Sequence, residues 1–209
     1  RRRTVVNFDA FSAVVKQRSI DVEHMKEALF EFIDDDGTRI DSVWWSITEG
    51  NEAIWPSKVL PFIDAPPYNE WADAGFNPVQ VLLDESRKRG LETFFSYRVN
   101  GSDKGVPGRR ARIPMKEAHP DWLIHTWNER SNVAYTSNAH SGFWNFAFQG
   151  VRDYKLSVLA EVAADYDFDG IEIDYFRSPF LFRPNLEFKP ATAAQCDLLT
   201  TFHRRIRAM

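Results

Sequence analysis

An α/β fold with parallel strands is predicted by three features of the 209-residue sequence. Short apolar segments alternate four times with segments of helical periodicity, always in the order strand and then helix. The connections from each helix to the next strand are short, whereas the connections from strand to helix are long. All eleven prolines lie in these long connections or at the helix starts that follow them. This asymmetry is typical of a (β/α)8 barrel, in which the strand-to-helix loops build the functional face.

The strands are predicted from runs that are rich in β-branched and aromatic residues. They cover residues 4–9, 40–47, 91–98 and 168–175. Strands that alternate with helices pair in parallel through right-handed crossovers, so the sequence predicts a single parallel sheet.

The helices are predicted from apolar residues at a spacing of 3.6 and from capping signals. The first covers residues 21–33. The second has an N-cap at Asn77 and a proline at its first position, and it ends at Lys88-Arg89-Gly90 with basic residues and a C-terminal glycine. The remaining two are predicted over residues 151–166 and 192–207.

Four βα units are half of a (β/α)8 barrel, so we expect a single domain over residues 1–209 that forms the N-terminal half of such a barrel. The chain opens with Arg and stops within a helical pattern, which indicates a piece of a longer protein. Its expected partner is the remaining C-terminal half of the barrel or a second copy, because open sheet edges favour association. A doubly wound open sheet is the alternative, but no glycine-rich phosphate loop follows the first strand.

Composition excludes several kinds of partner and site. The net charge of −4 argues against a nucleic-acid surface, and no apolar segment approaches the ~20 residues that span a bilayer. Cys196 is the only cysteine, so neither an internal disulfide nor a cysteine-based zinc site can form. The usual metal-binding spacings of His, Asp and Glu are missing, and we expect no metal or other cofactor.

The predicted chemistry is carried by two carboxylates, Glu172 and Asp174, in the strand at residues 168–175. A period of two places Gly170, Glu172 and Asp174 on one face and the isoleucines on the other, which suits the side covered by helices. The carboxylates then point into the barrel, with Asp174 at its mouth and Glu172 one layer deeper. Buried charge is costly unless it is paired or used. We therefore expect both to be catalytic, Asp174 directly and Glu172 by tuning its ionisation.

The run Asp169-Gly170-Ile171-Glu172-Ile173-Asp174-Tyr175-Phe176-Arg177 resembles the fourth-strand signature of glycoside-hydrolase barrels. The nearest resemblance is to the bacterial glycosyl hydrolase-like family 10. It covers residues 91–182 and includes Ser96-Tyr97-Arg98-Val99-Asn100 and His119-Pro120-Asp121-Trp122-Leu123. The resemblance implies hydrolysis of a glycosidic bond in an oligo- or polysaccharide, with Asp174 as nucleophile or charge stabiliser. It is compatible with export to the periplasm or beyond, although no signal region is visible.

The motif of this strand can be compared with those of two other families of glycoside-hydrolase barrels. Family-18 chitinases carry their general acid, a Glu, two positions after the last Asp of this strand, where the present sequence has Phe176. The spacing Asp174-x-x-Arg177 is instead similar to that of retaining barrels such as the α-galactosidases, in which this Asp is the nucleophile. A second carboxyl group is expected from a later strand, because catalytic pairs flank the scissile bond. Within this chain the alternatives are Asp9 and Glu49.

Further residues are predicted to hold the sugar. Polar side chains at strand ends and in long loops suit sugar hydroxyls, and the tryptophans of the long loops suit the apolar faces of sugar rings. The predicted contacts are Asp9, Arg98, Asn100, His119, Trp122, Trp144 and Arg177.

Two other functions stay open at this point. A carbohydrate-binding barrel without catalytic activity would keep the cleft and lack the acid. A metal-dependent hydrolase or isomerase on the same fold would use Asp9, Glu172, Asp174, His119 and His125 as ligands, since these side chains are of the right type.

Overall fold

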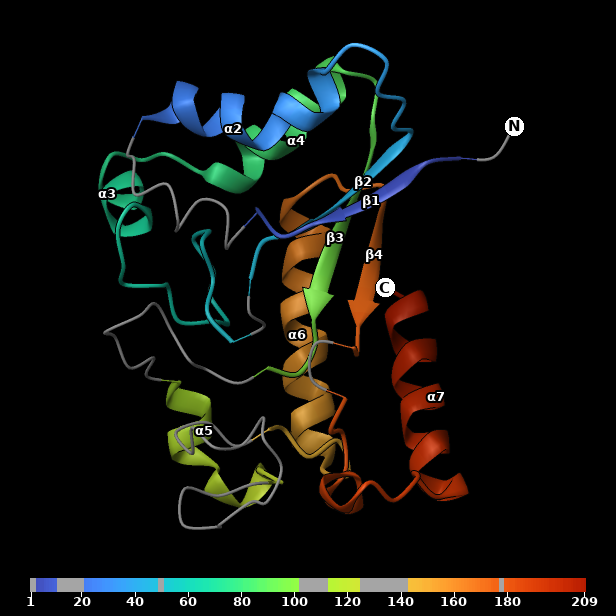
Figure 1. The fold of residues 1–209 in the computed structure, drawn as a ribbon. Coiled ribbons are helices and arrows are strands. Elements are labelled where there is room, and N and C mark those ends of the chain that lie inside the picture. Colours follow the sequence, from blue (N-terminus) through green and yellow to red (C-terminus); the bar gives the residue numbers. More distant parts are fainter. Residues whose placement is uncertain (1–2, 11–20, 49–50, 102–112, 125–142, 177–178) are drawn as a thin grey trace.

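The computed structural model describes residues 3–10, 21–48, 51–101, 113–124, 143–176 and 179–209. Within these residues four strands form one parallel sheet in the order β1-β2-β3-β4. The strands are β1 (Val5–Phe8), β2 (Ser42–Ser46), β3 (Glu92–Arg98) and β4 (Gly170–Asp174). All four predicted strands and their parallel pairing are confirmed. The sheet is twisted, and Figure 1 shows β1 crossing the direction of β3 and β4.

The four predicted helices are also present. They are α2 (Val22–Asp34), α4 (Pro78–Lys88), α6 (Gln149–Asp165) and α7 (Ala193–Arg207). In the described parts of the long connections there are four shorter helices that the sequence did not predict, because each is too short to show a periodicity. These are α3 (Tyr68–Asp73), α5 (Pro114–Ala118), and the 3-10 helices η1 (Pro120–Trp122) and η3 (Arg183–Glu187).

Local sequence explains where the helices begin and end. The side chain of Asn77 accepts hydrogen bonds from the backbone N–H groups of Val79 and Gln80 at 3.1 and 3.4 Å, which caps the first turn of α4. After α4, Gly90 adopts a φ of +68°, a left-handed conformation that ends the helix at little cost in a glycine. Helix α7 begins with a capping box, in which Thr192 and Gln195 each bind the backbone of the other.

The helices pack on one face of the sheet, and the main core lies between them. Trp45 of β2 is fully buried, lies 5.3 Å from the ring of Phe30 in α2 and donates a hydrogen bond to Ser86 in α4. Tyr97 of β3 accepts a hydrogen bond from Lys155 in α6, the helix that lies behind β3 and β4 in Figure 1. This face of the sheet is the helix side.

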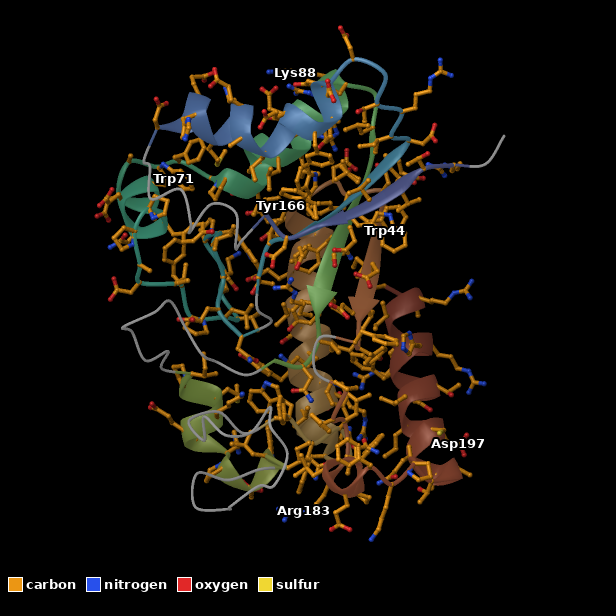
Figure 2. All side chains as sticks on the ribbon, in the orientation of Figure 1. Trp44, Trp71, Lys88, Tyr166, Arg183 and Asp197 are labelled. Carbon is orange, nitrogen blue, oxygen red and sulfur yellow. The ribbon has the colours of Figure 1, made fainter. Side chains whose placement is uncertain are left out.

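The opposite face of the sheet, called the inner face below, is organised in layers by the strand register. One layer contains Asn7, Trp44, Phe94 and Gly170, which lie opposite one another on the four strands. The rings of Trp44 (labelled in Figure 2) and Phe94 are 5.3 Å apart. A Cβ atom at position 170 would come within 2.3 Å of the Phe94 ring, so this layer requires a glycine. Layers of inward side chains are a feature of (β/α)8 barrels.

The sheet order agrees with consecutive units of a barrel. Doubly wound sheets reverse their strand order at a switch point and carry helices on both faces. In the described part of the chain the order is sequential, and the helices that contact the sheet lie on one face. The structure is therefore consistent with a partial (β/α) barrel.

Candidate active site

The register brings the predicted carboxylates to the carboxyl end of the inner face. Ser96 lies opposite Glu172, and Arg98 lies opposite Asp174. Ile171 and Ile173, which alternate with the carboxylates, pack against the main core on the helix side. The predicted alternation along β4 is thus confirmed, and it places Glu172 one layer below Asp174.

Asp174 ends β4 with its carboxylate held in place. Its Oδ1 accepts a hydrogen bond from the backbone N–H of Phe176 at 2.7 Å, and its carbonyl accepts one from the N–H of Val99 at 3.3 Å. The first bond is an Asx turn, which stops the strand and fixes the side chain relative to the backbone. The side chain of Phe176, in contrast, is 95% exposed.

Glu172 is half-buried within a small polar network. Its Oε2 accepts a hydrogen bond from Ser96 Oγ at 2.5 Å and a longer one from Asn7 Nδ2 at 3.5 Å. Burial raises the pKa of Glu172, and the charge of Asp174 raises it further. The hydrogen bond from Ser96 and the charge of Arg98 lower this pKa, but the net direction is upward.

Asp9 and Arg98 form an ion pair above this network. Arg98 Nη2 lies 2.8 Å from Asp9 Oδ2, and the Arg98 side chain is buried whereas that of Asp9 is 36% exposed. Because Asp9 follows β1 and Arg98 ends β3, the guanidinium reaches across β2. The predicted proximity of Arg98 to Asp174 is matched by their register, and the ion pair adds Asp9 to the same end of the sheet.

His119 and Trp122 stack on each other beside the N-terminus of α6. Their ring centroids are 3.8 Å apart and nearly parallel, and both side chains are half-buried. A Cβ atom at Gly150 would collide with the Trp122 ring, so that ring lies directly on the first turn of α6. The contacts described for this pair anchor α5 and η1 to α6.

The structure gives Asn100 and Trp144 a different role from the predicted sugar contact. Both are fully buried. Asn100 donates to the carbonyls of Trp144 and Phe180 at 3.1 and 2.7 Å and accepts from the Trp144 N–H at 2.9 Å. Trp144 donates its indole N–H to Asn51 at 2.6 Å. Protein groups therefore occupy these polar atoms, and we leave both residues out of the proposed site.

Other loop tryptophans show the same behaviour. Trp55 and Trp71 are buried in the main core, where they anchor the connection between β2 and α4. Large aromatic side chains in long loops pack inward as readily as they line a cleft, and sequence alone does not separate the two. Glu49, His125 and Arg177, which were named above, lie outside the described residues, and so does Trp127, another tryptophan of the long loops.

Helix α6 carries two charged residues that sequence reasoning missed. Lys155 is fully buried and donates to Asn51 at 3.0 Å and to the Tyr97 hydroxyl at 3.2 Å. Glu161 accepts from Trp55, Ser57 and the backbone N–H of Lys58. The burial of Lys155 could have been predicted, since this residue falls on the same helical stripe as Val151, Val158 and Val162. A cation on an apolar stripe is expected to be buried and bound.

Two further findings concern possible ligands and location. In the described ranges, no group of three or more His, Cys, Asp or Glu side chains is placed to hold a metal ion. No helix among the same residues has the length and apolar character needed to cross a bilayer.

Solved glycosidases share this fold. The α-galactosidase of Thermus thermophilus matches 99% of the chain with a TM-score of 0.51 and 12% identity, over 38% of its own length. An α-amylase of Lactobacillus plantarum matches 99% of the chain with a TM-score of 0.50 and 13% identity, over 42% of its own length. At these identities the likeness shows the fold alone, which is that of glycosidases built on a (β/α)8 barrel.

The chain belongs to the glycosyl hydrolase-like 10 family, whose model matches residues 9–185. It is 29% identical over 153 residues to glycosyl hydrolase DigH of Escherichia coli K12, a match that covers 67% of this chain and 32% of the relative. Glycosyl hydrolase YngK of Bacillus subtilis is 21% identical over 168 residues, which is 78% of this chain and 30% of the relative. The chain thus spans about a third of the length of these curated relatives. The family named from the sequence is confirmed.

Proposed function

We propose that this chain is the N-terminal part of the catalytic barrel of a glycoside hydrolase that cleaves an oligo- or polysaccharide. The observation that carries the proposal is the placement of Asp174, whose carboxylate ends β4 and is held by the N–H of Phe176 at 2.7 Å. Catalytic residues of (β/α)8 barrels stand at such strand ends. Membership of the glycosyl hydrolase-like 10 family supports the reaction class.

Asp174 acts as nucleophile or as stabiliser of the positive charge that develops on the sugar ring. Either role requires an ionised carboxylate in a fixed orientation. The Asx turn supplies the orientation, and Arg98 lies opposite Asp174 in the register. The second carboxyl group comes from the rest of the barrel, at a distance of about 5–5.5 Å for retention or about 6.5–9.5 Å for inversion.

Sugar hydroxyls are bound in this proposal by Asp9, whose carboxylate is partly exposed while Arg98 fixes its direction. The half-buried His119–Trp122 stack adds an aromatic surface, and Arg177, three positions after Asp174 in the sequence, adds a cation. A charged acceptor oriented by a buried guanidinium is a strong and directional partner for a hydroxyl.

The rest of the barrel is the partner we propose for the open sides of the sheet. Among the described residues β1 and β4 are edge strands, and Val5 of β1 is 45% exposed. Open edges present unpaired backbone groups that seek another strand. In the full-length protein, later βα units would pair with these edges and close the inner face.

The test compares the full-length protein with Asp174→Asn and with Asp197→Asn, a matched change on the exposed surface of α7. Release of reducing ends from a panel of α- and β-linked glycans measures turnover, and calorimetry with the same glycans measures binding. We expect Asp174→Asn to lose turnover and keep affinity, whereas Asp197→Asn keeps both. Equal turnover in Asp174→Asn and the wild type would refute the role of Asp174. Binding without turnover in the wild type would establish the non-catalytic alternative.

A further inference from the structure

Three strand-to-helix connections meet at one fully buried tryptophan, Trp144, which lies between β3 and α6. Its indole N–H donates to Oδ1 of Asn51, in the connection after β2, at 2.6 Å. Its backbone N–H and carbonyl bind the side chain of Asn100, directly after the end of β3, at 2.9 and 3.1 Å. Asn100 also donates to the carbonyl of Phe180, in the connection between β4 and α7, at 2.7 Å. These bonds join the three connections through buried groups.

Each of the two asparagine side chains has one orientation that satisfies these partners. Oδ1 of Asn51 accepts from the Trp144 indole and also from Nζ of Lys155 at 3.0 Å. An indole N–H and an ammonium group only donate, so a flipped amide would place its NH2 group against two donors. In Asn100, Oδ1 faces the N–H of Trp144 and Nδ2 faces two carbonyls, so a flip is excluded there as well. Both amides therefore hold their partners in a fixed arrangement.

Lys155 of α6 secures the Asn51 end of this network. Its fully buried ammonium group donates to Asn51 and to the Tyr97 hydroxyl, at 3.0 and 3.2 Å. The same ammonium group lies 5.4 to 5.6 Å from the ring centroids of Tyr97, Trp144 and Tyr154. A buried cation is costly unless polar or aromatic groups bind it, so the ammonium group favours the arrangement in which Asn51 Oδ1 faces it.

The other end of the network is the start of the β4–α7 connection, which carries Asp174. The N–H of Val99 donates to the Asp174 carbonyl at 3.3 Å, and the next residue, Asn100, binds the Phe180 carbonyl. Residues 174–180 are thus attached at both ends to two consecutive residues that follow β3 or end it. The Asx turn of Asp174 lies within this loop. The position of Asn100 consequently constrains the orientation of the Asp174 side chain.

We propose that Asn51 is a positioning residue for Asp174. It acts through Trp144 and Asn100 on the loop at residues 174–180, and Lys155 holds it in place. This inference rests on the proposed function, because it treats Asp174 as the catalytic carboxylate. It gives a buried asparagine of the β2 connection a role in turnover without contact with the sugar.

The experiment compares four forms of the full-length protein: the wild type, Asn51→Leu, Asn51→Asp and Ser86→Ala. Leucine has a similar volume and removes the acceptor, whereas aspartate keeps an acceptor oxygen. Ser86→Ala is the matched control, because it removes the buried acceptor of another indole, that of Trp45, whose bond is 3.0 Å long in the main core. Hydrogen exchange read by mass spectrometry follows the peptide with residues 174–181. kcat and KM are measured on a glycan that the wild type cleaves.

We expect exchange over residues 174–181 to be about tenfold faster in Asn51→Leu, because the indole and the ammonium group lose a buried partner. kcat should fall by about 10- to 100-fold, since a small misplacement of a catalytic group is sufficient for such a loss. KM should change much less, because Asp9 and Arg98 lie outside the loop. Asn51→Asp should return exchange and kcat towards the wild type. Ser86→Ala should lower the urea midpoint and leave the exchange of this peptide and kcat unchanged.

Two results would overturn the inference: exchange over residues 174–181 that is the same in Asn51→Leu and Ser86→Ala, or Asn51→Asp that behaves like Asn51→Leu. The exchange measurement needs no turnover, so it tests the loop even in a protein that only binds glycans. Turnover that is lost in Asp174→Asn and unchanged in Asn51→Leu would refute this inference and leave the proposed function intact.

The wild type gives an independent test if Asn51→Leu does not fold. In urea below the unfolding transition, the N–H groups of Val99, Trp144 and Phe176 should become exchangeable together, with the same dependence on urea, because they belong to one network. Opening of Phe176 at a lower urea concentration than Trp144 would show that the loop moves independently, and would overturn the inference.

Discussion

Asn100 offers a sharp test of whether a strand-end polar residue binds ligand or holds the protein together. Its side chain is fully buried and makes three hydrogen bonds, two as donor and one as acceptor, with backbone groups of Trp144 and Phe180. The change Asn100→Ala leaves three backbone groups without these partners in the interior. A buried polar group without its partner costs about 1 kcal/mol at the low end of the known range, so the three together cost about 3 kcal/mol.

The assay is urea unfolding of the full-length protein followed by tryptophan fluorescence and far-UV circular dichroism. The loss of about 3 kcal/mol is measured as the difference in the free energy of unfolding extrapolated to zero urea. The matched control is Asn145→Ala in the same loop, where the half-buried side chain accepts one bond, from the N–H of Ala147, and where about 1 kcal/mol or less is expected.

Two results would contradict the prediction for Asn100. If Asn100→Ala were as stable as Asn145→Ala, the buried hydrogen bonds would have no energetic role. If Asn100→Ala kept its stability and lost glycan affinity, the side chain would contact the ligand, as its position after β3 first suggested.

Four further results follow from the structure. Gly170→Ala should destabilise the fold by about 1–3 kcal/mol, because the new Cβ meets the Phe94 ring, and the double variant with Phe94→Leu should recover part of this loss in urea unfolding. An unchanged midpoint would show that the ring moves freely. Phe188 has a φ of +56° and is 80% exposed, so Phe188→Gly should stabilise the protein by about 1 kcal/mol in thermal melts, and a lower melting temperature would contradict this. The raised pKa of Glu172 predicts that the free energy of unfolding falls as pH rises from 4.5 through the higher folded pKa, and this fall should disappear in Glu172→Gln. Expressed alone, residues 1–209 should associate through their open sheet edges, and a stable monomer at micromolar concentration in light scattering would refute this.

The parts of the fold that were predictable are those governed by local chemistry. The Asn77 cap, the proline after it and the glycine at position 90 act within a few residues of the chain, and the structure reproduces all three. The alternation along β4 was equally predictable, because a strand has only two faces and the isoleucines required the helix side. These two rules were sufficient to bring Glu172 and Asp174 to the inner face.

The parts that were not predictable depend on contacts between distant segments. Nothing near Asn100 in sequence indicates that Trp144 and Phe180 will surround it, since they are 44 and 80 residues away. The Asp9–Arg98 pair spans 89 residues, and it emerges only when β1 and β3 take their places on either side of β2. Their positions at strand ends led us to expect sugar contacts, whereas the protein groups that they bind come from distant segments.

The two charged anchors on α6 have a mechanical consequence for the functional face. Lys155 holds the connection after β2 at Asn51, and Glu161 holds the same connection at Trp55, Ser57 and Lys58. Because residues 51–58 are hydrogen-bonded to α6 at two positions along that helix, we expect this segment to move with α6 and not independently of it. Ligand binding should therefore leave the conformation of residues 51–58 unchanged. Amide hydrogen exchange along these residues should be as slow as in α6 itself.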